Sequence, residues 1–536
     1  MSSIQNPILP GFNPDPSILR VGDDYYIATS TFEWFPGVQI HHSKDLAHWR
    51  LLTRPLDRVS QLDMRGVAAS DGVWAPCLSY KDGTFYLVYT IVRAIIKDQH
   101  NYVVTAKNIE GPWSEPVYLN SLGFDPSLFH DDDGRSYLVQ MALDPHRPHH
   151  FFKGIYLTEY DTETQELTGE TKRIFTRHIG ATEGPHLYKR NGFYYLMVAE
   201  GGTAYDHVIT VARSRDLWGG YEPDPASPML TARDTPDWPL QRAGHGCLVE
   251  TPAGEAYVAY LCSRPVRVEA DGRTKRYSIL GRETAIIPVE WTDEDWLRVK
   301  GGGTLPLETV PAPALPPHPF PTEEPTEIFD KASLSIAWQT LRQPHDPSWL
   351  TLRERPGWLR LYGRESLMSR FDPSLIARRI ESMETYVETR IDFTPDSPWQ
   401  MAGLTAFYGS RNHYLLAISK ADDDTRSLIL LKRHSGGEDQ LLPDDSIRLP
   451  ESGDIRLAFR LQGASLQFLY STEPEGPLLA AGDEQDATLL SDEHLGAFTG
   501  AFAGLAAVDL SGKRKPADFR CFTCRFARSP PPAMCR

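Results

Sequence analysis

The sequence predicts an all-β protein of two domains, a five-bladed β-propeller followed by an antiparallel β-sandwich. Three observations support this prediction: a hairpin pattern that recurs five times in the first 265 residues, a proline-rich break, and further strand patterns beyond the break. The chain has 536 residues, which is more than one hydrophobic core usually organises, and this length favours two domains.

Five segments share a short apolar strand, a turn that contains glycine, and an aromatic-rich strand. They begin at residues 15, 75, 125, 184 and 245. Asp-Gly and Asn-Gly turns supply the positive φ that a hairpin needs. Successive starts lie 50 to 61 residues apart, which is enough for about four strands in each repeat. The regular starts favour a propeller over the alternative, a β-sandwich or an irregular β-domain, which short strands alone would also permit.

A proline-rich segment separates the repeats from the rest of the chain. Eight prolines fall between residues 306 and 325, a composition typical of a stiff linker. Strand patterns such as Tyr386-Val-Glu-Thr-Arg-Ile-Asp-Phe then return. We therefore predict the propeller over 1–305, the linker over 306–325, the sandwich over 326–527 and a loose tail over 528–536, where prolines cannot continue a strand ladder.

The charge of the chain limits its partners. With 55 basic and 71 acidic residues the net charge is -16, which repels phosphate backbones and anionic membranes and argues against a nucleic-acid partner. The N-terminus lacks a basic segment followed by an apolar stretch, and no run of about eighteen apolar residues occurs. Six cysteines are too few for a disulfide framework. We expect a cytoplasmic protein with reduced thiols and no membrane span.

The starts of the five repeats carry a biased set of side chains. In a propeller the innermost strands of all blades meet around one axis, so residues at equivalent positions become neighbours. These positions hold Asp15, Trp74, Asp125, Glu183 and His245. Any one of the acids could equally be solvated or cap a turn. Three acids in the same register predict a shared acidic site.

Such a site has the groups that glycosidic cleavage needs. One carboxylic acid must protonate the leaving oxygen, and a second carboxylate must act as base or nucleophile. Aromatic side chains near the repeat starts could add an apolar wall for a sugar ring, although core packing is the alternative for some of them. They are Phe32, Trp34, Phe35 and Trp74, and Trp74 is the first choice.

Several motifs also match a known family. They include Asn13-Pro-Asp-Pro-Ser, Gly72-Val-Trp-Ala-Pro, Gly123-Phe-Asp-Pro-Ser, Thr182-Glu-Gly-Pro-His and Phe498-Thr-Gly-Ala-Phe. On these residues the chain resembles the β-xylosidases of glycoside hydrolase family 43 over both domains. The resemblance implies a C-terminal concanavalin-like jelly roll, inversion at the anomeric carbon, and exo-acting release of xylose from the non-reducing ends of β-1,4-xylo-oligosaccharides. The sequence departs from the family text at 68–71, 142–143, 204–207 and 264–278, which leaves the subsite walls and the sugar preference open.

The resemblance also implies roles for the three acids. Asp15 would be the general base, Glu183 the general acid, and Asp125 the carboxylate that tunes the acid and orients the substrate. A negative neighbour such as Asp125 would raise the pKa of Glu183 and keep it protonated near neutral pH. Inversion predicts that Asp15 and Glu183 stand about 6.5–9.5 Å apart, which leaves room for the attacking water.

Three further residues are assigned through the resemblance. Arg282 matches an arginine that reaches the substrate, with an ion pair to Glu283 as the alternative. Phe502 matches the residue that closes the site from the sandwich side. His245 matches the axial histidine that holds a divalent cation, here Ca²⁺, or only water, with a satisfied core histidine as the alternative. No metal ligand or cofactor is expected to be required.

Two rival functions and the state of assembly stay open. The chain could be primarily an α-L-arabinofuranosidase, because the two sugars place similar hydroxyls around the same acids, and this activity could also accompany xylosidase activity. It could instead be a non-catalytic carbohydrate-binding propeller, which would need no protonatable acid. Relatives often assemble, so a homo-oligomer, as dimer or tetramer, could form.

Overall fold

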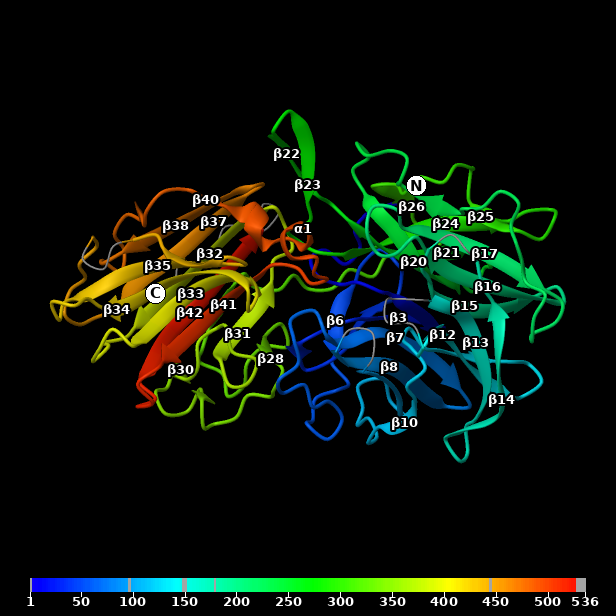
Figure 1. Cartoon of the computed structure of the whole chain (residues 1–536), viewed down its shortest axis with the longest axis horizontal. Helices are drawn as coiled ribbons and strands as arrows, with labels where there is room; N and C mark the ends of the chain where they lie inside the picture. Colours follow the sequence, from blue (N-terminus) through cyan, green and yellow to red (C-terminus); the bar gives the residue numbers. More distant parts are fainter. Residues whose placement is uncertain (1, 95–97, 147–151, 178–179, 443–445, 527–536) are drawn as a thin grey trace. The chain divides into compact units, whose positions relative to one another are not determined.

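The computed structural model forms two compact units of almost pure β-structure (Figure 1). It describes residues 2–94, 98–146, 152–177, 180–442 and 446–526. The first unit consists of Met1–Arg264 with Arg282–Phe320, and the second of Pro265–Gly281 with Pro321–Arg536. The segment Pro265–Gly281 falls within the propeller as predicted over 1–305, but it belongs to the second unit. The predicted loose tail at 528–536 lies outside the described residues.

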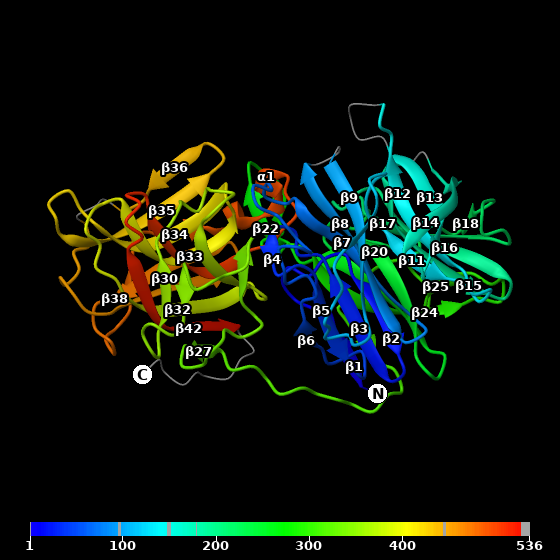
Figure 2. The ribbon, with the colours of Figure 1, turned by 90° about the horizontal axis from the view of Figure 1, so that it is seen from below.

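Within the described residues, the first unit contains five antiparallel sheets, each with four strands in line. The first sheet has the order β2 (Ser17–Val21), β3 (Asp24–Thr29), β5 (Gln39–Ser43), β6 (Arg50–Thr53), and the second has the order β7 (Gly72–Lys81), β8 (Thr84–Ala94), β9 (Asp98–Ala106), β10 (Val117–Asn120). The third sheet has the order β11 (Ser127–His130), β12 (Ser136–Leu143), β13 (Phe152–Asp161), β14 (Glu166–Phe175), and the fourth has the order β15 (Thr182–Arg190), β16 (Phe193–Glu200), β17 (Val208–Ser214), β18 (Glu222–Pro223), with β19 (Leu230–Thr231) also paired to β17. The fifth sheet has the order β20 (Gln241–Glu250), β21 (Ala256–Ser263), β24 (Glu283–Trp291), β25 (Leu297–Val299). Figure 2 shows β3 between β2 and β5 in the first sheet.

The first strands of the five sheets form a closed ring. β2 contacts β7, β7 contacts β11, β11 contacts β15, β15 contacts β20, and β20 contacts β2. Hydrophobic clusters fill the spaces between neighbouring sheets. One of them contains Val38, directly before β5 of the first sheet, and Leu87 of β8 in the second sheet. This arrangement confirms the predicted five-bladed propeller.

Two of the predicted hairpin turns show how an inner strand is joined to the second strand of its own sheet. Between β15 and β16 the chain turns at Asn191 (φ 50°) and Gly192 (φ 74°). Between β7 and β8 it turns at Asp82 (φ 49°) and Gly83 (φ 73°). Positive φ at both central residues matches the twist of antiparallel strands. These local sequences therefore fix where each inner strand ends.

The N-terminal segment and part of the proline-rich segment complete the first unit. β1 (Ser3–Gln5) pairs with β26 (Thr309–Pro311), and Leu9 forms a bridge with Thr284. The short strand β4 (Trp34–Phe35) also belongs to this unit. The compact unit runs to Phe320, beyond residue 305 where the sequence placed the end of the propeller.

The second unit contains two large antiparallel sheets in the part of the chain that the structure describes. One sheet has the order β29 (Leu350–Thr351), β30 (Leu359–Tyr362), β42 (Pro516–Phe526), β32 (Glu384–Asp392), β37 (Ile455–Gln462), β38 (Ser465–Ser471), β39 (Leu479–Ala480), with β27 (Thr326–Ile328) on β42 and β40 (Gln485–Asp486) on β38; the other has β36 (Gly437–Gln440), β35 (Arg426–His434), β34 (Asn412–Lys420), β33 (Gln400–Gly409), β41 (Phe502–Asp509), β31 (Ser374–Arg379), β28 (Gln339–Leu341). One apolar cluster joins both sheets, with Leu404 from one and Leu457 from the other. The predicted β-sandwich is thereby confirmed.

Three small elements complete this unit. They are the hairpin of β22 (Val266–Ala270) and β23 (Arg273–Tyr277), the 3₁₀ helix η1 (Ala487–Leu490) and the helix α1 (Asp492–Leu495). Helices are otherwise absent from the described ranges, and neither of these could reach across a bilayer's apolar core.

The cysteines depart from the prediction at one position. Cys77, Cys247, Cys262 and Cys524 are buried free thiols. Cys521 is disulfide-bonded. The prediction that all thiols are reduced is therefore wrong for Cys521.

Candidate active site

The residues at the repeat starts share an unusual backbone conformation. All five starts have positive φ: 55° at Asp15, 21° at Ala75, 54° at Asp125, 57° at Gly184 and 48° at His245. Non-glycine residues rarely adopt this region, and such positions gather at functional sites. The repeat that is visible in the sequence is thus also a repeat of backbone geometry.

The same positions interrupt the pairing of the inner strands. The register shifts between Trp74 and Cys77 on β7, between Glu183 and His186 on β15, and between Gly244 and Cys247 on β20. Bulges of this kind bend a strand and redirect a side chain. We use the term axial ring for the side chains that the five starts present: Asp15, Trp74, Asp125, Glu183 and His245.

Asp15 is held by several donors. Its Oδ1 accepts a hydrogen bond from Arg282 Nη1 at 2.9 Å, and its Oδ2 accepts one from Ser30 Oγ at 2.6 Å. His245 Nδ1 lies 3.6 Å from Oδ1. Charge-assisted bonds of this type are short and directional. They fix the orientation of this buried carboxylate.

Asp125 and Glu183 are two further carboxyl groups of the site, and they interact with each other. Asp125 Oδ2 accepts a hydrogen bond from the backbone N–H of Gly184 at 3.0 Å, which ties it to the residue that follows Glu183. Burial raises the pKa of Asp125 well above its usual value, and the charges of Glu183 and Asp15 add to this effect. Burial also raises the pKa of Glu183 to about 7, and the charge of Asp15 adds to it while that of Arg282 opposes it.

The source of the raised pKa differs in part from the prediction. The sequence argument named Asp125 as the neighbour that raises the pKa of Glu183. In the structure burial has the largest effect on Glu183, and Asp15 supplies the added negative charge. The charge of Glu183 acts in turn on Asp125. Because the two carboxyls interact strongly, their proton affinities belong to the pair.

Arg282 connects the axial ring to an aromatic side chain. Its guanidinium lies over the Phe32 ring, 5.3 Å from the centroid. The alternative ion pair with Glu283 is not formed, because Glu283 binds Arg264 at 2.7 Å. Arg282 Nη1 also donates to Thr203 Oγ1 at 3.0 Å, a contact that sequence reasoning missed.

The aromatic residues divide into two groups. Phe32 and Trp74 lie beside each other with ring centroids 5.7 Å apart, and Trp74 is half-buried, with its Nε1 donating to the Ser70 carbonyl at 3.1 Å. Trp34 and Phe35 are fully buried in the core. Phe32 is also fully buried, so Trp74 is the half-buried member of the four. The role of these side chains as a wall for a sugar ring stays a prediction.

His245 and His207 are both neutral imidazoles at this site. Burial lowers the pKa of His245 to about 4 and that of His207 to about 3. His207 donates from Nδ1 to the Arg242 carbonyl at 3.1 Å, and Gly244 leaves the space for its ring, because an added Cβ would lie 2.2 Å from Nδ1. The sequence marked 204–207 only as a departure from the family. A glycine opposite a histidine carries no signal in a single sequence.

The surroundings of His245 do not suit the Ca²⁺ ion that was expected there. Ca²⁺ takes about six to eight oxygen ligands. The groups beside His245 are the His186 ring, at 6.4 Å between centroids, and the Asp15 carboxylate that Arg282 already binds. Within the described ranges, no group of three or more His, Cys, Asp or Glu side chains is arranged to hold a metal ion. Water as the partner of His245 stays a prediction.

Phe502 lies in the second unit. It is the first residue of β41 and is buried, with the Arg379 guanidinium 5.2 Å from its ring centroid. Its predicted place at the substrate site stays a prediction.

An arginine-bound carboxylate next to two carboxyls of raised pKa, on the axis of a five-bladed propeller, defines an acid-base site of the glycoside hydrolase class. The chain matches the model of glycosyl hydrolases family 43 over residues 4–297 and that of the beta xylosidase C-terminal concanavalin A-like domain over residues 326–525. It belongs to glycosyl hydrolase family 43, and the resemblance stated from the motifs is confirmed.

Individual relatives cover the whole chain. It is 49% identical to "Xylosidase/arabinosidase 43B" of Humicola insolens over 99% of both chains. It is 44% identical to a "Beta-xylosidase" of Bacillus subtilis (strain 168), over 97% of this chain and 99% of the relative. The crystal structure of a xylan beta-1,4-xylosidase from Bacillus halodurans C-125 superposes with a TM-score of 0.94 at 51% identity, covering 98% of this chain and 100% of the other. The expected enzyme class is thereby confirmed.

Proposed function

We propose that this protein is an exo-acting, inverting glycoside hydrolase that releases xylose from the non-reducing ends of β-1,4-xylo-oligosaccharides. The observation that carries the proposal is the pKa of about 7 at Glu183, beside an Asp15 carboxylate that Arg282 binds and orients. One group can give a proton near neutral pH, and the other can accept one. The names of the relatives, xylosidases over the full chain, supply the sugar.

In this proposal Glu183 is the general acid and Asp15 the general base. Glu183 gives its proton to the leaving glycosidic oxygen, and Asp15 takes a proton from the water that attacks the anomeric carbon from the opposite face. Ser30 and Arg282 hold Asp15 so that its free lone pairs face the water. Attack from the opposite face inverts the configuration.

Asp125 has a positioning role in this mechanism. Its hydrogen bond to the Gly184 N–H holds the bulge that carries Glu183. Burial and then the charges of Glu183 and Asp15 raise its pKa, so Asp125 and Glu183 are not both ionised near neutral pH. Arg282, Phe32 and Trp74 would bind the terminal sugar, with His245 and Phe502 as the further substrate contacts.

A second activity is favoured by the names of two relatives. One, at 49% identity, is named for both xylosidase and arabinosidase activity, and another, at 35%, is a "Non-reducing end alpha-L-arabinofuranosidase" of Bacteroides ovatus. A "Xylan 1,3-beta-xylosidase" of Vibrio sp at 45% identity makes the linkage a separate question. Rates on the nitrophenyl β-xyloside and α-L-arabinofuranoside, measured side by side, and on 1,4- and 1,3-linked xylobiose, distinguish these activities.

The stereochemistry of the first product tests the mechanism. Proton NMR of β-1,4-xylobiose hydrolysis should show α-xylose first, which then mutarotates. β-Xylose as the first product would contradict inversion and the base role of Asp15. We further propose that the protein works in the cytoplasm on imported oligosaccharides, requires no cofactor and assembles as a homo-oligomer; fractionation, chelator treatment and sedimentation check these points in turn.

A further inference from the structure

A cavity of about 560 Å³ lies on the propeller axis beyond the axial ring. Five of its lining residues stand two positions after the five repeat starts: Ser17, Cys77, Ser127, His186 and Cys247. Side chains two positions apart on a strand point to the same side. These residues therefore form a second ring on the same five strands, which we call the thiol ring. None of them has a role in the mechanism proposed above.

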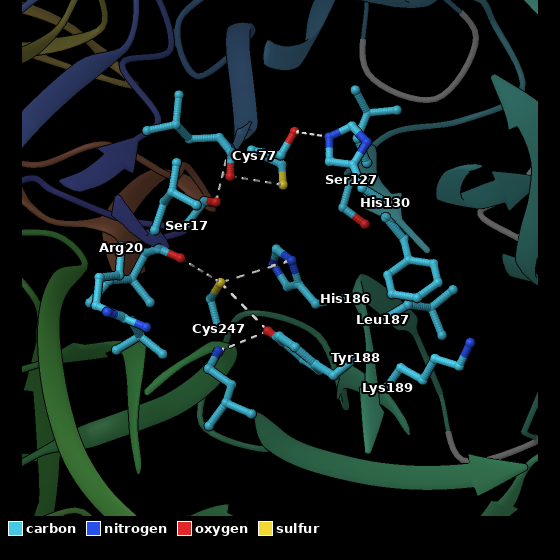
Figure 3. A pocket seen from close by; sticks show the side chains of 18 of the residues that line it. Ser17, Arg20, Cys77, Ser127, His130, His186, Leu187, Tyr188, Lys189 and Cys247 are labelled. Atoms are coloured by element: carbon cyan, nitrogen blue, oxygen red, sulfur yellow. Dashed lines mark hydrogen bonds between the residues drawn. The ribbon is translucent and has the colours of Figure 1, made fainter. Parts of the chain in front are cut away.

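Three groups surround the sulfur of Cys247 (Figure 3). The Tyr188 hydroxyl donates a hydrogen bond to Sγ at 3.6 Å, and His186 Nδ1 lies 3.9 Å from Sγ. Sγ is 3.5 Å from the carbonyl oxygen of Ile18. The Tyr188 oxygen itself accepts the Leu248 N–H at 2.8 Å, which holds the hydroxyl in place. A nucleophile next to an imidazole and a hydroxyl donor is the arrangement that activates thiols.

The surroundings favour the thiolate at Cys247 and disfavour it at Cys262 and Cys524. Although burial raises the pKa of Cys247, the charge and hydrogen bond of His186 and the hydrogen bond of Tyr188 bring it below the usual value. Burial raises the pKa of Cys262 well above its usual value, and it raises that of Cys524 to about 12. Neither Cys262 nor Cys524 lines the cavity.

The cavity gives this sulfur a route to solvent. Its rim includes Arg20 and Lys189, whose side chains are exposed. Lys189 is bound to Asp131, which also lines the cavity, at 2.7 Å. Cys247 is itself nearly buried, and the space next to it suits a small reagent.

We propose that Cys247 is a modification site for small thiol-directed electrophiles, namely low-molecular-weight disulfides and thiosulfonates, which reach it through the axial cavity. The Cys247 thiol transfers its proton to His186 Nδ1, and its sulfur attacks one sulfur of the reagent. The new S–S bond forms as the reagent's S–S bond breaks, and the leaving thiolate or sulfinate departs with the bonding electrons and takes up a proton from solvent. This inference does not depend on the proposed function.

Labelling of the full chain tests the proposal without any assay of turnover. The reduced protein is treated with methyl methanethiosulfonate, sampled over time, digested, and analysed by mass spectrometry for the methylthio group on each cysteine. Cys247 should be labelled about tenfold or more faster than Cys262 and Cys524, as expected for a thiol with thiolate character and access. Equal rates at Cys247 and Cys262, or a methylthio group that appears first on Cys77, would overturn the proposal.

A matched pair of variants tests the activating contact. Tyr188→Phe removes only the hydroxyl and should slow labelling of Cys247 about threefold or more. Tyr195→Phe removes a hydroxyl that binds the Asp295 carbonyl at 2.7 Å, away from the cavity, and should leave the Cys247 rate unchanged. An unchanged rate in Tyr188→Phe would contradict the proposed activation. The wild-type comparison among cysteines decides the site itself, even if a variant folds poorly.

Discussion

The axial ring and the thiol ring stand on or directly before the same five inner strands, two or three residues apart, and have opposite chemistry. The axial ring combines three carboxyls with an aromatic and a neutral histidine, bound from outside by Arg282. The thiol ring has two cysteines, two serines and His186, and carries no carboxylate. The strands themselves are equivalent, so a shift of two or three positions along the strand is what separates acid-base chemistry from thiol chemistry.

Backbone geometry accompanies this chemical difference. The axial ring coincides with positive φ at all five repeat starts and with bulges on β7, β15 and β20. At the far ends of the inner strands, regular pairing continues into tight hairpins such as that at Asn191. Positive φ at the far ends falls on Asn, Asp and Gly of hairpin turns, which adopt it readily, whereas at the axial ring it falls on residues of the proposed catalytic site, where such conformations gather. Equivalent substitutions at the two ends should therefore have unequal effects.

The largest difference is expected for a glutamate at each end. Glu183→Gln keeps the shape of the side chain and removes the proton donor, so kcat should fall about 10²- to 10⁴-fold. Glu250→Gln, at the cavity end of β20, should change kcat less than about twofold, within the range of ordinary surface substitutions. Steady-state kinetics on nitrophenyl β-xyloside measures both.

The same variant separates the enzyme from a carbohydrate-binding protein. Calorimetric titration of Glu183→Gln with xylobiose should still show binding. Turnover at the wild-type rate in Glu183→Gln, or an equal loss in Glu250→Gln, would remove Glu183 from its role as the acid.

Arginines at the two ends provide the second comparison. Arg282→Met leaves the buried Asp15 without its charged donor, which should lower kcat/KM about 10- to 100-fold, as the loss of a hydrogen bond to a charged group does. Arg20→Met, at the rim of the cavity, loses a bond to the Gly22 carbonyl at 3.2 Å and should leave kcat/KM within about twofold.

The pH dependence of kcat/KM tests the direction in which Arg282 shifts the pKa of Glu183. Glu183 must be protonated to act as the acid, so kcat/KM of the wild type should fall as pH rises through about 7. The charge of Arg282 lowers the pKa of Glu183. Its removal should move the falling limb to higher pH, whereas Arg20→Met should leave the limb in place. A shift to lower pH in Arg282→Met would contradict the described electrostatics.

Two glycines on one hairpin provide the smallest and most selective comparison. Gly184 (φ 57°) lies in β15 at the axial ring, and Gly192 (φ 74°) lies in the turn that follows β15. Alanine at either position should lower the free energy of unfolding by about 1–2 kcal/mol, because of the positive φ. A Cβ added at Gly184 would lie 2.8 Å from the His245 ring. A Cβ added at Gly192 would lie 3.5 Å from the Arg215 side chain, its one neighbour within 4 Å.

Only Gly184→Ala should therefore also lose activity, by about tenfold, since a displacement of about 1 Å near a site has effects of this size or larger. Denaturant unfolding and kcat, measured on both variants, separate strain from displacement. Equal kcat in the two variants would show that the Gly184 N–H and His245 do not position the carboxyls.

Much of the axial ring could be predicted because the repeated hairpin pattern is visible in the sequence. Asp-Pro-Ser at 15 and 125, and turn glycines seven to nine residues after each repeat start, indicate both the blade number and the equivalence of positions. The contacts of Arg282 could not be predicted from position alone, because Asp15 lies 267 residues away. Thr203 and His207 carry no recognisable motif, and their importance depends on which side chains they meet.

The sequence by itself determined the two β-domains, the five blades and the identity of the three acids, because turn chemistry and strand periodicity act over a few residues and repeat along the chain. Only the tertiary structure decided how protons are held at the site. The pKa of about 7 at Glu183 results from burial and from the charge of Asp15, which closure of the ring brings close. Tertiary structure likewise decided that Cys247 meets His186 and Tyr188 in a cavity, because a cavity is a property of packing between strands and not of any one of them.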